Sequence, residues 1–182
     1  MNFYNLWIIF VILRIFTGSL WVLSSKIRRE NAWPDEFKHP KILIVYSFPF
    51  LTLLIVAIFT PIRLGNLFYI GLMLLIIAGI IYVLAIIAFI KSKKGMNMIG
   101  IYKYSRNPMY VTMFLFFIGF IFMTWQVNQI MGILTIFITL ISAFAFHWIV
   151  LSEERFLIKK YGDAYRKYTD KTPRYWGLPK DD

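Results

Sequence analysis

The sequence has no cysteine and little charge. Cys is 0, and charged residues make up 16% of the 182 residues, against about 25% in ordinary globular chains. The missing cysteines exclude a disulfide scaffold, thiol catalysis, thiolate metal sites and redox switching. With 59% hydrophobic residues the chain is too apolar for a disordered protein or for an ordinary soluble domain. The length predicts a single domain over residues 1–182.

Long hydrophobic runs, by contrast, are abundant. A helix that crosses a bilayer needs roughly 20 apolar residues, and five stretches reach or approach that length. They cover about residues 3–23, 42–60, 66–90, 108–125 and 130–151. Backbone groups inside lipid must hydrogen-bond within their own segment, and the runs show no strand-like alternation. The sequence therefore predicts an all-α integral membrane protein with about five transmembrane helices.

The basic residues flank these runs. Of 20 Lys and Arg residues, 18 lie in residues 24–41, 91–107 and 152–182, and only Arg14 and Arg63 lie elsewhere. Five spans place the three basic segments on one side of the membrane, which the positive-inside rule makes the cytoplasmic side. We therefore predict a cell-membrane protein with its N-terminus outside and its C-terminus inside. We therefore attribute the net charge of +11 to interaction with the membrane surface and not with a nucleic acid.

Polar and aromatic side chains lead into the fourth span. Asn107 and Pro108 predict a helix start, because Asn favours the N-cap and Pro the first helical position. One interpretation ends there. In the other, the free N–H groups of the helix start and the guanidinium of Arg106 bind a carboxylate or phosphate, and Tyr102 and Tyr110 supply aromatic walls.

Two adjacent glutamates, Glu153 and Glu154, stand at the predicted end of the fifth span, although acidic residues number only 9. A helix C-terminus is unfavourable for anions. Either the pair is solvated and bridges to basic residues that follow it, or it meets a ligand or a more distant basic partner. The basic residues that follow it closely are Arg155, Lys159 and Lys160.

Three further features are polar. His147 lies seven residues before Glu154 and so on the same helix face; it is either a satisfied bundle-facing residue or part of a site. Arg14, near the middle of the first span, should face the bundle or snorkel, and it could meet a ligand headgroup. Residues 161–173 predict a short cytoplasmic amphipathic helix after Gly162, which could lie on anionic lipid or cover a site.

Taken together, several motifs resemble a known superfamily. They are Arg106-Asn107-Pro108-Met109-Tyr110, a tight hairpin of two spans, Glu153-Glu154, and Tyr161-Gly162 followed by Tyr165, Tyr168 and Pro173. In this order and spacing they are similar to the isoprenylcysteine carboxyl methyltransferases and phospholipid methyltransferases, which are integral-membrane enzymes dependent on S-adenosylmethionine. The resemblance covers about residues 100–173.

The resemblance implies a cofactor site for S-adenosylmethionine and no metal. By position, the implied cofactor-binding residues are Tyr102, Arg106, Asn107, Pro108, Tyr110, Glu153 and Glu154. Among these, Arg106 and Glu154 are the implied catalytic pair. Lys171 matches a basic position near the acceptor, and with His147 it is expected to bind substrate. The implied acceptor is a lipid or a prenylated molecule that reaches the cytoplasmic interface from the bilayer.

The chain departs from the family pattern at two positions. Asn107 stands where the branch that methylates prenylated cysteine usually has His, and Thr112 stands where Gly is usual. Two other functions stay open: an NADPH-dependent membrane reductase of the sterol reductase type, and a small non-catalytic membrane subunit.

Overall fold

The structure of the chain, a computed structural model, describes residues 4–28, 40–92 and 96–180. In chain order the elements are α1 (Trp7–Arg28), α2 (Pro40–Phe59), α3 (Asn66–Lys91), the short 3-10 helix η2 (Gly100–Lys103), α4 (Pro108–Val127), α5 (Gln129–Tyr161) and α6 (Asp163–Lys171). The described ranges form no β-strand. Helices α1 to α5 are long and apolar enough to cross a membrane, which confirms the predicted all-α membrane fold.

The helix bounds follow the predicted spans, with one important difference. Helix α5 does not end near Leu151 but continues to Tyr161. At about 1.5 Å per residue its 33 residues measure about 50 Å, well beyond a hydrocarbon core of about 30 Å. Its last turns therefore project out of the membrane. Glu153 and Glu154 lie within this projecting helix and not at its C-terminus, so the expected conflict with the helix dipole does not arise.

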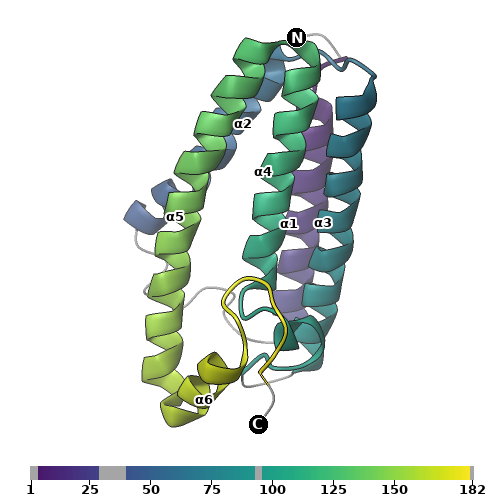
Figure 1. Cartoon of the computed structure of the whole chain (residues 1–182). Helices are drawn as coiled ribbons and strands as arrows, with labels where there is room; N and C mark the ends of the chain where they lie inside the picture. Colours follow the sequence, from purple (N-terminus) through teal and green to yellow (C-terminus); the bar gives the residue numbers. More distant parts are fainter. Residues whose placement is uncertain (1–3, 29–39, 93–95, 181–182) are drawn as a thin grey trace.

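Helices α3 and α4 pack most closely, and α1 runs beside them, whereas α2 and α5 contact each other (Figure 1). Glycines permit the close α3–α4 contact: a Cβ built on Gly71 would lie 2.5 Å from the carbonyl oxygen of Gly119. Aromatic side chains fill the interior of the bundle, where Phe117, Phe120 and Phe146 are fully buried. The ring of Phe117 on α4 lies 5.8 Å from that of Phe146 on α5, and the ring of Phe120 lies 6.0 Å from that of Phe10 on α1. Small residues at one contact and large rings at the other give the bundle its shape.

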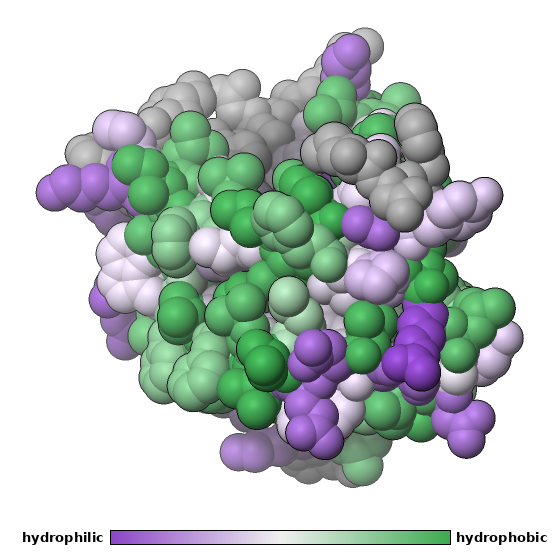
Figure 2. All heavy atoms as spheres, turned by 90° about the horizontal axis from the view of Figure 1, so that it is seen from above, coloured by the Kyte–Doolittle hydropathy of each residue, from purple (hydrophilic) through white to green (hydrophobic). Residues whose placement is uncertain are grey.

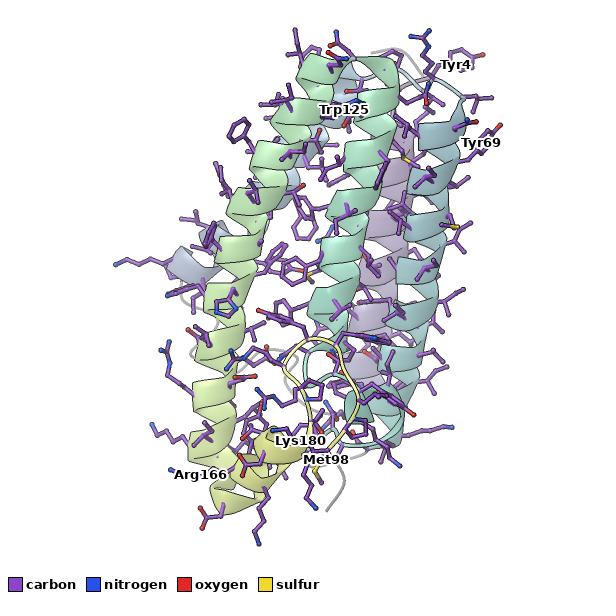
Figure 3. The ribbon with its side chains drawn as sticks, in the orientation of Figure 1. Tyr4, Tyr69, Met98, Trp125, Arg166 and Lys180 are labelled. Atoms are coloured by element: carbon purple, nitrogen blue, oxygen red, sulfur yellow. The ribbon has the colours of Figure 1, made fainter. Side chains whose placement is uncertain are left out.

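The two ends of the bundle differ in character. Tyr69 and Trp125 lie near one end, and Arg166 and Lys180 lie near the other (Figure 3). Seen from above, onto the end of the bundle near which the N-terminus lies, hydrophobic side chains cover much of the face and hydrophilic ones lie mostly toward its edge (Figure 2). Apolar helices with aromatic residues near one end and basic residues near the other are typical of a membrane protein. Four basic residues of the predicted charge pattern lie outside the described residues: Arg29, Lys38, Lys93 and Lys94. The cytoplasmic assignment of the basic end stays a prediction.

Two connections position the segments that carry the candidate site. A single residue, Asn128, joins α4 to α5, and its side chain caps α5 by accepting a hydrogen bond from the N–H of Ile130 at 2.8 Å. The predicted tight hairpin is therefore confirmed. At the other end of α5, Gly162 adopts a φ of 57°, a conformation that favours glycine, and α6 begins at the next residue. Helix α6 thereby lies below the start of α4 (Figure 1).

The residues after α6, 172–180, form a segment that we call the C-terminal strap. Its backbone bonds to the segment before α4: the N–H of Arg106 donates to the carbonyl of Pro173 at 3.0 Å, and the N–H of Gly177 donates to that of Tyr104 at 3.1 Å. The strap thus holds together two parts of the chain about 70 residues apart.

Candidate functional site

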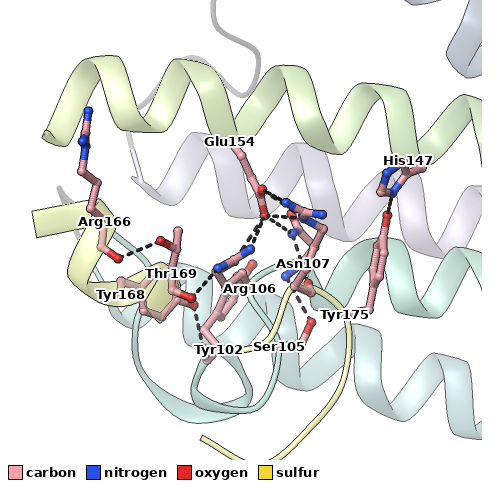
Figure 4. Close-up of polar contacts among 11 residues, drawn as sticks. Tyr102, Ser105, Arg106, Asn107, His147, Glu154, Arg166, Tyr168, Thr169 and Tyr175 are labelled. Carbon is pink, nitrogen blue, oxygen red and sulfur yellow. Dashed lines mark hydrogen bonds and ion pairs between the residues drawn. The ribbon is translucent and has the colours of Figure 1, made fainter. Parts of the chain in front are cut away.

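A buried carboxylate, that of Glu154, lies at the centre of the polar contacts at the basic end of the bundle (Figure 4). Arg106 reaches its Oε1 through Nη2 at 3.0 Å and through Nε at 3.2 Å. Arg174 of the C-terminal strap reaches Oε2 through Nη2 at 2.9 Å and through Nε at 3.0 Å. Asn107 donates from Nδ2 to Oε1 at 3.3 Å. We call these four residues the Glu154 cluster.

The charge of the Glu154 cluster is not balanced. Two guanidinium groups share one carboxylate, which leaves one positive charge over. Arg106 and Glu154 are each only 8% exposed at the side chain, whereas the side chain of Arg174 is 37% exposed. The hydrogen bond with Glu154 raises the pKa of Arg174 above its ordinary value. The surplus charge therefore lies on a group that solvent or a bound anion can reach.

Local sequence explains how Asn107 enters this cluster. It is the N-cap residue of α4 and Pro108 is the first helical residue, as predicted. The Asn107 side chain does not cap the helix, however; it donates to Glu154 and to the carbonyl of Arg174 at 3.2 Å. Its own N–H donates to the hydroxyl of Ser105 at 3.1 Å. The expected cap is thus replaced by a contact with the site.

Helix α6 closes the cluster from below. Arg106 donates from Nη1 to the carbonyl of Thr169 at 2.8 Å, and the hydroxyl of Tyr168 donates to the carbonyl of Tyr102 at 2.6 Å. Burial is the main cause that raises the pKa of Tyr102, Tyr165 and Tyr168. These three phenols therefore stay protonated at neutral pH, so they remain neutral hydrogen-bond donors.

Glu153 faces a different environment from its neighbour. It accepts a hydrogen bond from the hydroxyl of Tyr110 at 3.1 Å, and both residues line a cavity of about 340 Å³ inside the bundle. The rest of the wall is mainly apolar and comes from α1, α2, α3 and α4; it includes Leu75 and Phe116. Consecutive glutamates thus contact two compartments: Glu154 the cluster near the strap, and Glu153 the cavity between the spans.

The cavity wall also holds two residues noted in the sequence. Arg14 lines it and places its Cζ 4.0 Å from the ring centroid of Phe50, so this arginine faces the bundle. Thr112 lines it as well, and its hydroxyl donates to the carbonyl of Met109 at 2.6 Å. The methyl and hydroxyl groups of Thr112 therefore occupy space at the cavity that a glycine would leave open.

The other predicted site residues lie around the cluster without joining it. Tyr102 packs in a small apolar cluster with Ala85 and Ala88. The Nδ1 atom of His147 lies 2.6 Å from the hydroxyl of Tyr175, so this histidine has a partner in the C-terminal strap. Lys171 is exposed at the end of α6.

The sequence interpretation missed one member of the cluster, Arg174. Glu154 was expected to pair either with basic residues that follow it closely or with a more distant partner, and in the described part of the chain its partners are distant. Of the neighbours, Arg155 instead donates to Ser152 at 3.0 Å. Two signals could have indicated Arg174. A glutamate beside a membrane needs a countercharge, and Arg174 directly follows Pro173, which belongs to the motif that resembles the superfamily.

Five apolar helices with a polar cluster at one end define an integral membrane protein whose polar site lies near the membrane surface. A family model described as phospholipid methyltransferase matches residues 66–164, which is more than half of the chain. The chain therefore belongs to the phospholipid methyltransferase family, within the superfamily of membrane methyltransferases that includes the isoprenylcysteine carboxyl methyltransferases. This confirms the resemblance found in the sequence. A search of curated proteins gave no match.

Proposed function

We propose that this protein transfers a methyl group from S-adenosylmethionine to a lipid-soluble acceptor, at the cytoplasmic surface of the cell membrane. The observation that carries the proposal is that Glu153 and Glu154 contact different surroundings. One step along α5 separates a polar cluster beside the C-terminal strap from a mainly apolar cavity between the spans. A water-soluble donor and a lipid-soluble acceptor need this kind of junction, because each must approach from its own solvent.

The Glu154 cluster suits the polar groups of S-adenosylmethionine. The carboxylate of that molecule matches the surplus positive charge on Arg174, and its ammonium and ribose hydroxyls match the carboxylate of Glu154. Neutral Tyr165 and Tyr168 add aromatic surface and hydroxyl donors beside the cluster. When bound, S-adenosylmethionine supplies an electrophilic methyl group on a sulfonium sulfur. Arg106, Asn107 and Arg174 then act by holding and orienting charged groups, and positioning supplies much of the rate in such a reaction.

We place Glu153 and Tyr110 on the acceptor side. Their hydrogen bond lies in the cavity wall, so an acceptor in the cavity meets them before it meets Glu154. An amine or hydroxyl acceptor must give up a proton when it is methylated, and the Glu153 carboxylate is placed to take it, whereas a carboxylate acceptor needs no base. His147 is bonded to Tyr175 of the strap, and Lys171 is exposed at the end of α6. These two residues can therefore contact the acceptor only if the strap and α6 move.

Calorimetry on the purified protein in detergent tests the cofactor assignment. We expect S-adenosylhomocysteine to bind and NADPH not to bind. Binding of NADPH alone would support the reductase alternative, and binding of neither would support a non-catalytic subunit. The acceptor can then be identified from cells fed methyl-labelled methionine, by comparing labelled lipids with and without overexpression.

A further inference from the structure

Arg14 lies inside a membrane span and forms no ion pair within the part of the chain that the structure describes. It lies seven residues into α1 and fourteen residues before Arg28. At about 1.5 Å per residue, about 20 Å of helix separates it from the basic end of the bundle, which is too far for the side chain to snorkel there. Its guanidinium lies over the ring of Phe50 on α2, at the cavity wall.

The ring of Phe50 satisfies only part of what a guanidinium requires. A cation–π contact attracts the charge but accepts few of the five N–H donors. Within residues 4–28, 40–92 and 96–180, no side chain or carbonyl accepts a hydrogen bond from this guanidinium, and it forms no ion pair. Glu153, the acidic residue of the cavity wall, accepts a hydrogen bond from Tyr110, and within the described residues it forms no ion pair with Arg14. Unpaired charges inside a membrane are costly and mark ligand sites.

The cavity has the size and pattern of a site for an amphiphile. Its volume of about 340 Å³ falls within the range of roughly 300–1,000 Å³ for small-molecule sites. Its wall holds the polar pair of Glu153 and Tyr110, the cation of Arg14, and apolar side chains such as Leu75 and Met113. Two glycines of the wall, Gly18 and Gly79, have nothing within 4 Å of where a Cβ would stand, which leaves room beside α1 and α3.

We infer that Arg14 binds an anionic group, a carboxylate or a phosphate, of a lipid-soluble acceptor that occupies this cavity. The inference rests on the proposed function and narrows it. The acceptor is a lipid-soluble acid with two polar points: a nucleophilic group beside Glu153 and Tyr110, and an acidic group at Arg14. A neutral isoprenoid or a simple alcohol would leave the guanidinium without a partner, so Arg14 selects against it.

The test uses the full chain in a neutral detergent and three probes with the same alkyl chain: dodecanoate, dodecyl phosphate and dodecanol. Binding is measured by competition against radiolabelled dodecanoate. We expect both anionic probes to bind the wild type at least tenfold more tightly than dodecanol, and Arg14→Gln to remove that preference. The better anionic probe identifies the acidic group, and free inorganic phosphate should not compete, because the site requires the alkyl chain.

Matched variants separate the role of Arg14 from general attraction of anions. Lys26→Gln removes one positive charge from the exposed surface of the same helix and should leave binding of all three probes unchanged. Arg14→Lys keeps the charge and should retain most of the anion preference. An unchanged preference in Arg14→Gln, or an equal loss in Lys26→Gln and in Arg14→Gln, would overturn the inference. A loss in Arg14→Lys as large as in Arg14→Gln would also overturn it.

S-adenosylhomocysteine binding and helix content by circular dichroism are measured on the same samples. Arg14 is remote from the Glu154 cluster, so both readouts should match the wild type in Arg14→Gln, which shows that the variant is folded. If the wild type binds dodecanoate through Arg14 but does not bind S-adenosylhomocysteine, the inference about Arg14 stands and the proposed methyl transfer fails. If the wild type binds S-adenosylhomocysteine but does not bind dodecanoate through Arg14, only the inference about Arg14 is rejected.

Discussion

Arg174 decides how the charge of the site is shared, because it provides the second guanidinium on the carboxylate of Glu154. It uses both Nε and Nη2 for this contact. A fork of this kind is geometrically specific, and lysine offers only a single ammonium group in its place. The strap that carries Arg174 is also held by backbone hydrogen bonds and by the contact of Tyr175 with His147, so a change of the Arg174 side chain should alter the site without unfolding the protein.

We therefore predict that Arg174→Lys weakens S-adenosylhomocysteine binding by about ten- to a hundredfold, since a hydrogen bond to a charged group contributes about 1.5–3 kcal/mol. Calorimetry measures the change. Arg166→Lys is the control, because the side chain of Arg166 on α6 is 68% exposed and its ion pair with Asp163 is long at 3.9 Å. This variant should bind S-adenosylhomocysteine as tightly as the wild type does. Equal affinities in Arg174→Lys and the wild type would remove Arg174 from the cofactor site.

The two adjacent glutamates should have separable effects, because they contact different compartments. Glu154→Gln keeps the size of the side chain but removes the charge shared by Arg106 and Arg174, so it should abolish S-adenosylhomocysteine binding. Glu153→Gln should leave that binding intact. Instead it should raise KM for the acceptor or lower kcat, depending on whether Glu153 binds the acceptor or takes its proton. Similar loss of S-adenosylhomocysteine binding in both variants would contradict the division into two compartments.

At the scale of the helices, the glycines of α3 have two different roles. Gly71 lies against the backbone of Gly119 and the side chain of Met123, whereas Gly79 faces the open cavity. A side chain at the first position must push α3 and α4 apart. A side chain at the second position enters empty space.

Gly71→Leu should accordingly lower thermal stability, by at least the 1–3 kcal/mol or so that overpacking usually costs. Gly79→Leu should keep the thermal stability of the wild type but occupy the cavity, and it should therefore reduce acceptor methylation without changing S-adenosylhomocysteine binding. Thermal unfolding in detergent and a methylation assay measure the two effects. Normal methylation by a stable Gly79→Leu variant would show that the acceptor does not use this cavity.

The helices were easier to predict from the sequence than the contacts between them. Hydropathy indicated all five spans, because every helix that crosses the bilayer needs about 20 apolar residues. It did not indicate where α5 ends, because the last turns of α5, after Leu151, lie outside the lipid and depend on packing against the rest of the chain. For the same reason the sequence predicted Glu154 as a site residue but did not predict its contact with Arg174, which lies 20 residues away across a helix break at Gly162.

At the scale of the whole molecule, the site and the membrane orientation are linked. Helix α6 and the strap lie at one end of the bundle (Figure 1), and Arg166 and Lys180 lie at the same end (Figure 3). The Glu154 cluster belongs to this end, because Arg174 of the strap and the start of α4 take part in it. The positive-inside rule predicts that this end faces the cytosol, where S-adenosylmethionine is made available to enzymes. If this end instead faced outward, the proposed cofactor site would be cut off from its donor, so orientation is a direct test of the proposed function.

The absence of cysteine makes the orientation measurable with single substitutions in an otherwise unreactive chain. Arg63→Cys places a thiol on the exposed connection between α2 and α3, and Lys159→Cys places one on the exposed end of α5 at the opposite end of the bundle. In intact cells, a membrane-impermeant maleimide should label Arg63→Cys at once and Lys159→Cys only after the membrane is permeabilised. Each substitution replaces an exposed basic residue with cysteine, so each variant serves as the labelling control for the other. The reverse labelling pattern would place the Glu154 cluster outside the cell, and a cytosolic methyl donor could then not reach it.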